Sequence, residues 1–140
     1  MPEALPGGTG TLGVVSVTVD LAEIAEQLDR FGRAPYLLTT GDGGCPHATH
    51  IVVQVAGGTF ECAVGRKTAA NVAATPDVCL LWAPHEPGGY SLIVDGRAVQ
   101  DVDAGEGIVR IEPVRAVLHR NALGDGYQAD CVPLDTRHET

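Results

Sequence analysis

Hydrophobic and polar positions along the chain follow a helical period first and a strand-like period afterwards. Within residues 20–32 the apolar positions recur at helical spacing, at Leu21, Ile24, Ala25, Leu28 and Phe31. Asp20 is suited to cap the first turn, and Glu23, three residues later, completes a capping box. Gly32 suits the residue that closes a helix. The pattern therefore predicts one amphipathic helix over residues 20–32.

From residue 35 onward, alternating runs separated by turn residues predict six strands. They cover residues 35–41, 47–56, 59–65, 77–83, 89–103 and 107–120. Gly57 and Gly58 fit a two-residue hairpin turn between the second and third strands. Glu112 and Pro113 interrupt the last strand, which suits a bulge or an edge position. An Ala-rich stretch ending at Pro76 breaks the alternation and predicts a helix of two turns.

Six hairpin-connected strands with one inserted short helix favour a small antiparallel barrel over a parallel α/β sheet. We therefore expect a mainly β (α+β) fold. The length of 140 residues is that of a single domain. We expect an N-terminal arm over residues 1–19, a barrel domain over 20–120 and a tail over 121–140 packed on that domain. The sequence leaves open whether the arm is loose or adds an edge strand.

Charge and composition exclude several classes of partner. The formal charge of −9 opposes binding to nucleic acid or to an anionic membrane, because both would be repelled at long range. No stretch approaches the roughly 20 apolar residues that span a bilayer. The first residues lack the basic start and apolar run of a secretory signal, so we expect a cytoplasmic protein.

The four cysteines form no CxxC pair, so the sequence contains neither a zinc ribbon nor a thioredoxin-type redox motif. Cys62 and Cys79 lie in apolar runs and are expected to be buried free thiols. Cys45 and His47 are two residues apart, but no third ligand lies near them in the sequence. We therefore expect no metal site.

The segment with the most specific chemistry is Gly65-Arg66-Lys67-Thr68. Lys67 is the only lysine of the chain, and no acidic residue lies between Glu61 and Asp77. A strand ends here and a helix is expected to begin at Thr68, so free backbone N–H groups would face the same anion as the two cations. Arg binds phosphate through paired hydrogen bonds, and Lys adds a point charge. The segment is either a phosphate site or a solvated basic turn.

Acid–base and nucleophilic motifs are missing from the sequence. There is no GxSxG elbow and no GxGxxG that opens a helix after a strand. Such a chain suits a protein in which a redox cofactor performs the chemistry and the protein supplies binding and orientation. The sequence leaves the catalytic residues unknown.

Three segments in order carry a resemblance to a known family. They are YLLTTGDGGCPHATHIVV, TFECAVGRKTAANVAATPDVCLLW and GYSLIVDGRAV. Together they resemble the pyridoxamine 5′-phosphate oxidase-related family of flavin-binding split barrels, from about the first helix through the fifth strand. The resemblance implies a six-stranded antiparallel split β-barrel with Greek-key connections and short flanking helices. It also implies a homodimer with a cofactor groove at the interface.

The resemblance further implies a set of cofactor contacts. Arg66 and Lys67 would hold the cofactor phosphate, supported by Thr68 and Asn71. The strand beside the flavin ring and ribityl chain would supply His47, Thr49, His50, Ile51 and Val52. Trp82 would reach the same groove from a neighbouring strand.

The resemblance implies FMN as cofactor, with the deazaflavin F420 or heme as alternatives. Pyridoxamine 5′-phosphate oxidase itself has an Arg that aligns near Thr49, and this chain lacks that Arg. The C-terminal substrate motif of that enzyme, with its Arg and Trp, is also missing from residues 121–140. We therefore expect an oxidoreductase that is not a true pyridoxamine 5′-phosphate oxidase and transfers hydride between its cofactor and a small organic substrate. The alternatives are a non-catalytic flavin- or heme-binding protein and a partner-binding dimer without cofactor.

Overall fold

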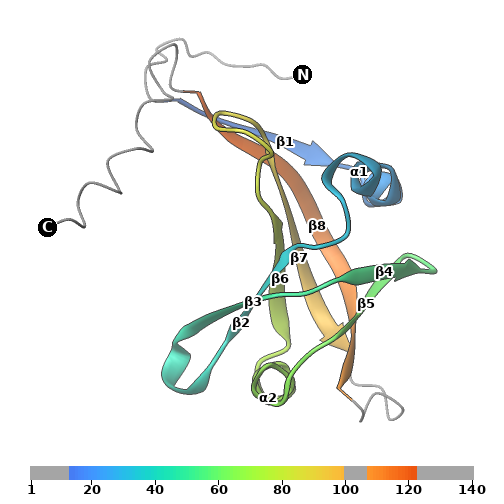
Figure 1. The fold of residues 1–140 in the computed structure, drawn as a ribbon, viewed down its shortest axis with the longest axis vertical. Helices are drawn as coiled ribbons and strands as arrows, with labels where there is room; N and C mark the ends of the chain where they lie inside the picture. The colour runs from blue at the N-terminus through green and yellow to red at the C-terminus, as the bar shows by residue number, and fades with distance from the viewer. Residues whose placement is uncertain (1–12, 100–106, 123–140) are drawn as a thin grey trace, which may run out of the picture.

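The computed structural model describes residues 13–99 and 107–122, which form one curled antiparallel sheet and two short α-helices (Figure 1). The strands are β1 (Gly13–Val19), β2 (Tyr36–Thr40), β3 (Pro46–His50), β4 (Val53–Ala56), β5 (Thr59–Ala63), β6 (Asp77–Trp82), β7 (Ser91–Val99) and β8 (Ile108–Ala122). The helices are α1 (Ile24–Phe31) and α2 (Arg66–Ala74), and the 3-10 turns are η1 (Leu21–Glu23) and η2 (Asp42–Gly44).

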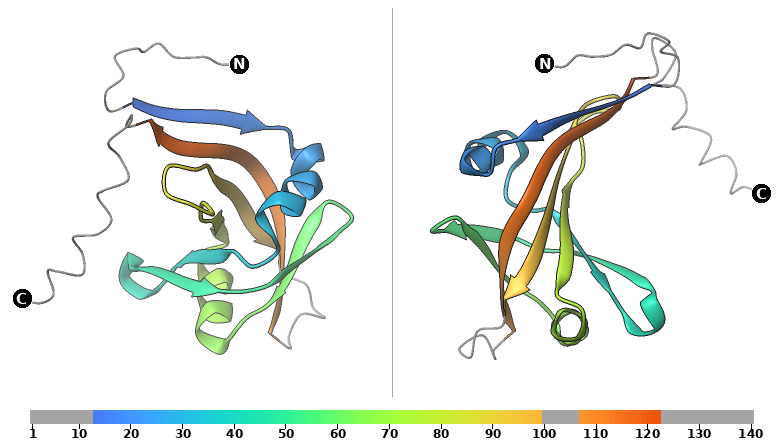
Figure 2. Two further views of the ribbon diagram at one scale, coloured as in Figure 1. Left: turned by 45° about the horizontal axis from the view of Figure 1, so that its top comes forward. Right: turned by 180° about the vertical axis from the view of Figure 1, so that it is seen from behind.

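The strands follow the order β3-β2-β6-β7-β8-β5-β4, and β1 also pairs with β8. The long strand β8 pairs with β7 along one edge and shares its other edge between β5 and β1. Figure 2 shows β1 beside one half of β8 and the sheet curling into half a barrel. The predicted antiparallel split-barrel class is confirmed, with eight strands in the described residues instead of six.

The first additional strand is β1. Residues 13–19 pair with β8 from Gly13↔Ala122 to Val19↔Ala116, so this part of the predicted arm is an added edge strand. Residues 1–12 and 123–140 of the predicted arm and tail lie outside the described residues, as does Cys131.

The second additional strand arises because the predicted strand over residues 47–56 is divided in two. β3 pairs with β2, whereas β4 pairs with β5. Between them, the N–H groups of Ile51 and Val53 donate to the carbonyl oxygens of Pro35 and Arg33, at 3.1 and 2.8 Å. The alternation of buried and exposed side chains continues through the break, so the hydrophobic pattern could not reveal it.

The predicted first helix is present as η1 followed by α1. Asp20 caps it, because Asp20 Oδ1 accepts a hydrogen bond from the N–H of Ala22 at 3.1 Å. Ile24 and Leu28 are buried and Phe31 is half-buried, whereas Leu21 is 41% exposed. The helix therefore covers the core with a narrower apolar face than the predicted one.

The core lies inside the curl of the sheet. Its most deeply buried large side chains are Leu37, Val53, Phe60, Leu80, Leu92, Val94 and Ile111. Trp82 belongs to it, 2% exposed, with its ring centroid 6.0 Å from that of Phe60. None of the helices in the described residues is long and apolar enough to cross a membrane.

Two predicted irregularities are confirmed. Gly57 and Gly58 have φ angles of 61° and 84°, as a two-residue hairpin turn between β4 and β5 requires. The β7–β8 register shifts so that Asp95 opposes Arg115 and Gly96 opposes Pro113, which places a bulge in β8 at the predicted interruption.

Candidate functional site

Helix α2 begins two residues earlier than predicted, at Arg66, with Gly65 at the N-cap position. Thr68 therefore lies inside the first turn and does not begin the helix. The first N–H groups of a helix have no intrahelical partner. No hydrogen bond between described residues uses the N–H groups of Arg66, Lys67 or Thr68. These groups are free to bind an anion at the start of the helix.

The side chains of Arg66 and Lys67 are exposed, and neither forms an ion pair with another described residue. Three arginines on the strands differ from this basic pair, because each of them faces a carboxylate on the neighbouring strand. The cross-strand pairs are Arg97–Asp77, Arg110–Glu61 and Arg115–Asp95, at 3.2, 3.1 and 3.4 Å. The start of α2 is thus a local surplus of positive charge on an acidic protein.

Three polar residues are buried in the described part of the chain, two of them on α2 and the third on the neighbouring strand β2. They are Thr39, Thr68 and Asn71, at 4, 3 and 6% exposure. Asn71 Nδ2 donates to Thr39 Oγ1 at 3.1 Å, which ties α2 to β2. Thr68 Oγ1 shares a hydrogen bond with His47 Nε2 at 3.5 Å, which ties the first turn of α2 to β3. These bonds fix the position and direction of the basic N-terminus.

The predicted cofactor strand presents two faces. Along β3, His47 and Thr49 are half-buried, while His50 is exposed on the other side. His47 and Thr49 thus share one face of the strand, and His50 lies on the other. The structure therefore brings His47 to the start of α2 and places His50 on the opposite face, where its ring stacks on Tyr36 with the centroids 4.9 Å apart.

The other predicted contacts differ in exposure. Val52 is 65% exposed just beyond the end of β3, whereas Ile51 is 7% exposed. Trp82 is a core residue, and its Nε1 donates to the carbonyl oxygen of Gly32 at 2.9 Å. The structure does not bring Trp82 together with Arg66 in any hydrogen bond or ring contact. Its role as a cofactor contact stays a prediction.

Sequence reasoning missed Thr39. The alternation of strand β2 places Leu37 and Thr39 on the same buried face. A polar residue at an inward position of a strand needs a buried partner, and that pattern was the available signal. The partner, Asn71, is 32 positions away in the sequence, so the pair itself becomes visible only in the fold.

The donor set at the start of α2 fits a phosphate monoester. It consists of one guanidinium, one ammonium and free backbone N–H groups, and all of these donate hydrogen bonds. Among the described residues, no three His, Cys, Asp or Glu side chains are grouped as metal ligands. The arrangement can therefore bind and orient a phosphate-bearing molecule through direct contacts.

Comparison with known proteins places the chain in a family. No family model matches the chain. The uncharacterized proteins Mb0449c of Mycobacterium bovis and MT0457 of Mycobacterium tuberculosis are each 37% identical to it over 143 residues. Each alignment covers 81% of this chain and 93% of the relative.

Three solved structures share the fold at lower identity. An F420 reductase has a TM-score of 0.52 and 17% identity, over 65% of this chain and 94% of its own. A putative pyridoxamine 5′-phosphate oxidase from Listeria innocua has a TM-score of 0.53 and 19% identity, over 74% of this chain and 98% of its own. The FAD-binding protein from Mycobacterium smegmatis has a TM-score of 0.51 and 21% identity, over 78% of this chain and 98% of its own. The chain therefore belongs to the family of Mb0449c and MT0457, and its fold is the split barrel of the pyridoxamine 5′-phosphate oxidase-like, FAD- and F420-binding proteins.

Proposed function

We propose that this protein is a split-barrel oxidoreductase that binds a phosphorylated flavin or deazaflavin and acts on a small organic molecule. The observation that carries the proposal is the unpaired Arg66–Lys67 pair at the N-terminus of α2. A similar fold in an F420 reductase and in a FAD-binding protein supports the choice of cofactor class.

The residues at α2 would divide the work of holding this cofactor. Arg66, Lys67 and the first N–H groups of the helix would bind the phosphate. Thr68 and Asn71 face inward, where they fix the helix through His47 and Thr39. The bound group would supply hydride transfer, and the protein would supply its orientation.

We also propose that the working form is a homodimer with the cofactor groove at its interface. Within the described residues β3 pairs only with β2, so its other edge is open. Val52, just beyond the end of β3, is 65% exposed, and Tyr36, on the neighbouring strand β2, is 45% exposed. A second copy lying along this edge would cover them and would reach residues from both faces of β3.

The test is a titration of the purified protein with FMN, F420 and heme, each followed by absorbance or fluorescence. Saturable binding of FMN or F420, weakened about tenfold or more by Lys67→Gln, is the expected result. Lys67 has no partner within the described protein, so this change should leave the thermal midpoint unaltered. Arg33→Gln, an exposed cation outside the site, is the matched control.

Two outcomes would redirect the proposal. Binding without any reduction or oxidation of the bound group by a panel of organic substrates would favour a non-catalytic cofactor-binding protein. Failure of all three compounds to bind at tens of micromolar would contradict cofactor binding itself.

A further inference from the structure

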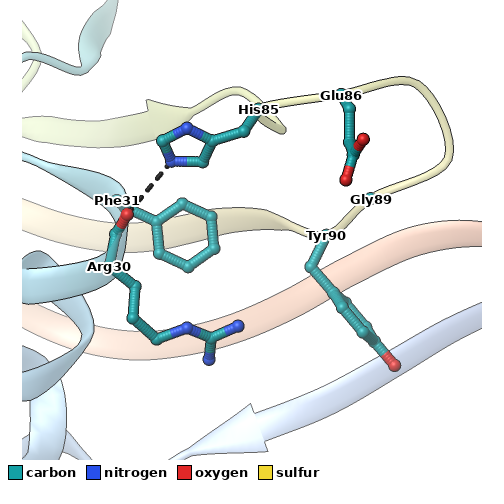
Figure 3. A pocket seen from close by; sticks show the side chains of 6 residues that line it. All are labelled: Arg30, Phe31, His85, Glu86, Gly89 and Tyr90. Carbon is teal, nitrogen blue, oxygen red and sulfur yellow. Dashed lines mark hydrogen bonds between the residues drawn. The ribbon is translucent and has the colours of Figure 1, made fainter.

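A second candidate site lies at the other end of the fold from α2. The C-terminus of α1 and the 83–90 connection between β6 and β7 border a half-open hollow of about 270 Å³. Figure 1 shows α1 and this connection toward the upper end of the sheet and α2 at the lower end. The residues that line the hollow are Arg30, Phe31, His85, Glu86, Gly89 and Tyr90 (Figure 3).

The hollow is held in shape by its own contacts. His85 Nε2 donates to the carbonyl oxygen of Arg30 at 3.0 Å, which tethers the 83–90 connection to the end of α1. The N–H of Gly89 donates to the carbonyl oxygen of Glu86 at 2.9 Å, which closes a turn. Pro84 precedes this turn and Pro87 lies within it, and both restrict the backbone. A ligand would thus meet a largely preformed site.

Aromatic rings form the walls of the hollow. The ring of Phe31 lies 6.0 Å from that of His85, at an angle of 40°. Tyr90 stands on the opposite side in Figure 3. The guanidinium of Arg120 lies 5.0 Å from the ring centroid of Tyr90. Such walls suit one flat apolar ring.

Two opposite charges border the same space. Arg30 extends its guanidinium along the ring of Phe31, 5.7 Å from the centroid, and Glu86 points its carboxylate into the space from the other side (Figure 3). The two side chains form no ion pair with each other or with any other described residue. Each is therefore available to a ligand, one as a donor and one as an acceptor.

We propose that this hollow binds a small aromatic zwitterion, that is, one ring carrying a carboxylate and an ammonium. The carboxylate would pair with Arg30, the ammonium with Glu86, and the ring would lie between Phe31 and Tyr90. The volume of about 270 Å³ falls just below the roughly 300–1,000 Å³ of pockets for drug-sized ligands, which fits a single-ring molecule.

The test uses three probes that share one phenyl ring: L-phenylalanine, phenethylamine, which lacks the carboxylate, and 3-phenylpropionate, which lacks the ammonium. Binding is followed by NMR titration of the backbone amides. L-Phenylalanine is expected to bind about fivefold more tightly than either of the other two, because each exposed charge pair adds a modest gain. The shifted amides should fall in residues 30–31 and 85–90.

Two variants then test which protein side chain binds which charged group of the ligand. Arg30→Gln should remove the preference for L-phenylalanine over phenethylamine, and Glu86→Gln should remove the preference over 3-phenylpropionate. Arg33→Gln, an exposed arginine three residues from Arg30 and outside the hollow, should change neither ratio. Absence of saturable binding up to about 20 mM, or equal affinity for the three probes, would overturn the proposal. Changes at Arg66 and Lys67 should not affect these ratios, so this site and the cofactor site can fail independently.

Discussion

Gly96 is the residue at which the sheet leaves least room for a side chain. A Cβ atom there would lie 2.6 Å from Ile111 Cγ2 and 3.0 Å from the carbonyl oxygen of Glu112. Ile111 is completely buried, and Glu112 precedes the bulge in β8, so neither neighbour moves easily. The packing of β7 against β8 therefore depends on glycine at this position.

Replacing Gly96 by Ala should lower the free energy of unfolding by about 1–3 kcal/mol, as overpacking of a filled core does. Urea denaturation of the two proteins measures the change. Gly65→Ala is the matched control, because a Cβ at Gly65 meets nothing within 4 Å and its effect is limited to the N-cap position of α2. A Gly96→Ala protein as stable as the control would contradict the close packing of Gly96 against Ile111 and Glu112.

The described cysteines differ sharply in environment. Cys45 is exposed, whereas burial raises the pKa of Cys62 to about 11, and burial together with Asp95 raises the pKa of Cys79 to about 11. Both inner thiols stay protonated at neutral pH, and a protonated thiol is a poor nucleophile. The prediction of buried free thiols is confirmed for Cys62, which is 4% exposed, whereas Cys79 is a free thiol that is only half-buried.

In a Cys131→Ala background, iodoacetamide at pH 8 should alkylate Cys45 and leave Cys62 and Cys79 largely unmodified until the protein unfolds. Raising the pH to 10 should still leave the inner thiols mostly protonated, because their pKa values lie near 11. Peptide mass spectrometry measures each site. Equal rates at Cys45 and Cys62 in the folded protein would contradict the burial.

At the scale of elements, α2 is the helix on which the candidate site depends. The buried hydrogen bond from Asn71 to Thr39 joins it to β2, and Thr68 joins it to His47 on β3. A buried polar group that loses its partner retains its desolvation cost. The direction of the helix N-terminus is thus maintained by a few polar contacts beneath it.

Asn71→Ala should lower the free energy of unfolding by about 1–3 kcal/mol, because Thr39 Oγ1 loses its buried donor. Gln54→Ala, which removes an exposed amide on β4, should have little effect and serves as the control. A double-mutant cycle with Thr39→Val measures the coupling between the two side chains. A coupling energy of zero would show that the pair does not hold α2.

The elements themselves show how far the sequence pattern reaches. Local sequence features predicted three elements, because each depends on neighbouring residues: periodicity predicted α1, the glycine pair predicted the hairpin at Gly57, and Pro113 predicted the bulge. It could not predict the break after His50, since the switch from β2 to β5 is set by partners distant in the sequence. The basic pair Arg66–Lys67 was visible as a local motif, whereas the buried support from Thr39 was not.

At the scale of the whole molecule, the open edge of β3 and the exposed side chains beside it favour a second copy of the chain. Val52, which lies just beyond the end of β3, is 65% exposed, and among the described strands β3 pairs only with β2. Apolar side chains at an open edge are a liability for a monomer and are normally covered. The proposed dimer would cover them.

Sedimentation velocity should show a dimer for the wild-type chain and a shift toward monomer for Val52→Asp. Val114→Asp is the matched control, because Val114 is 62% exposed at the bulge in β8, away from the β3 edge. A wild-type monomer, or dissociation by both changes equally, would contradict an interface at β3.

The central claim is that Arg66 and Lys67 hold the phosphate of a bound cofactor. The most direct measurement compares the affinities of the protein for FMN and for riboflavin, which differ only by that phosphate. The wild type should prefer FMN by about tenfold or more, and Arg66→Gln/Lys67→Gln should bring the ratio close to one while Arg33→Gln leaves it unchanged. Equal affinity for the two flavins in the wild type, or a ratio that survives the double change, would contradict the account.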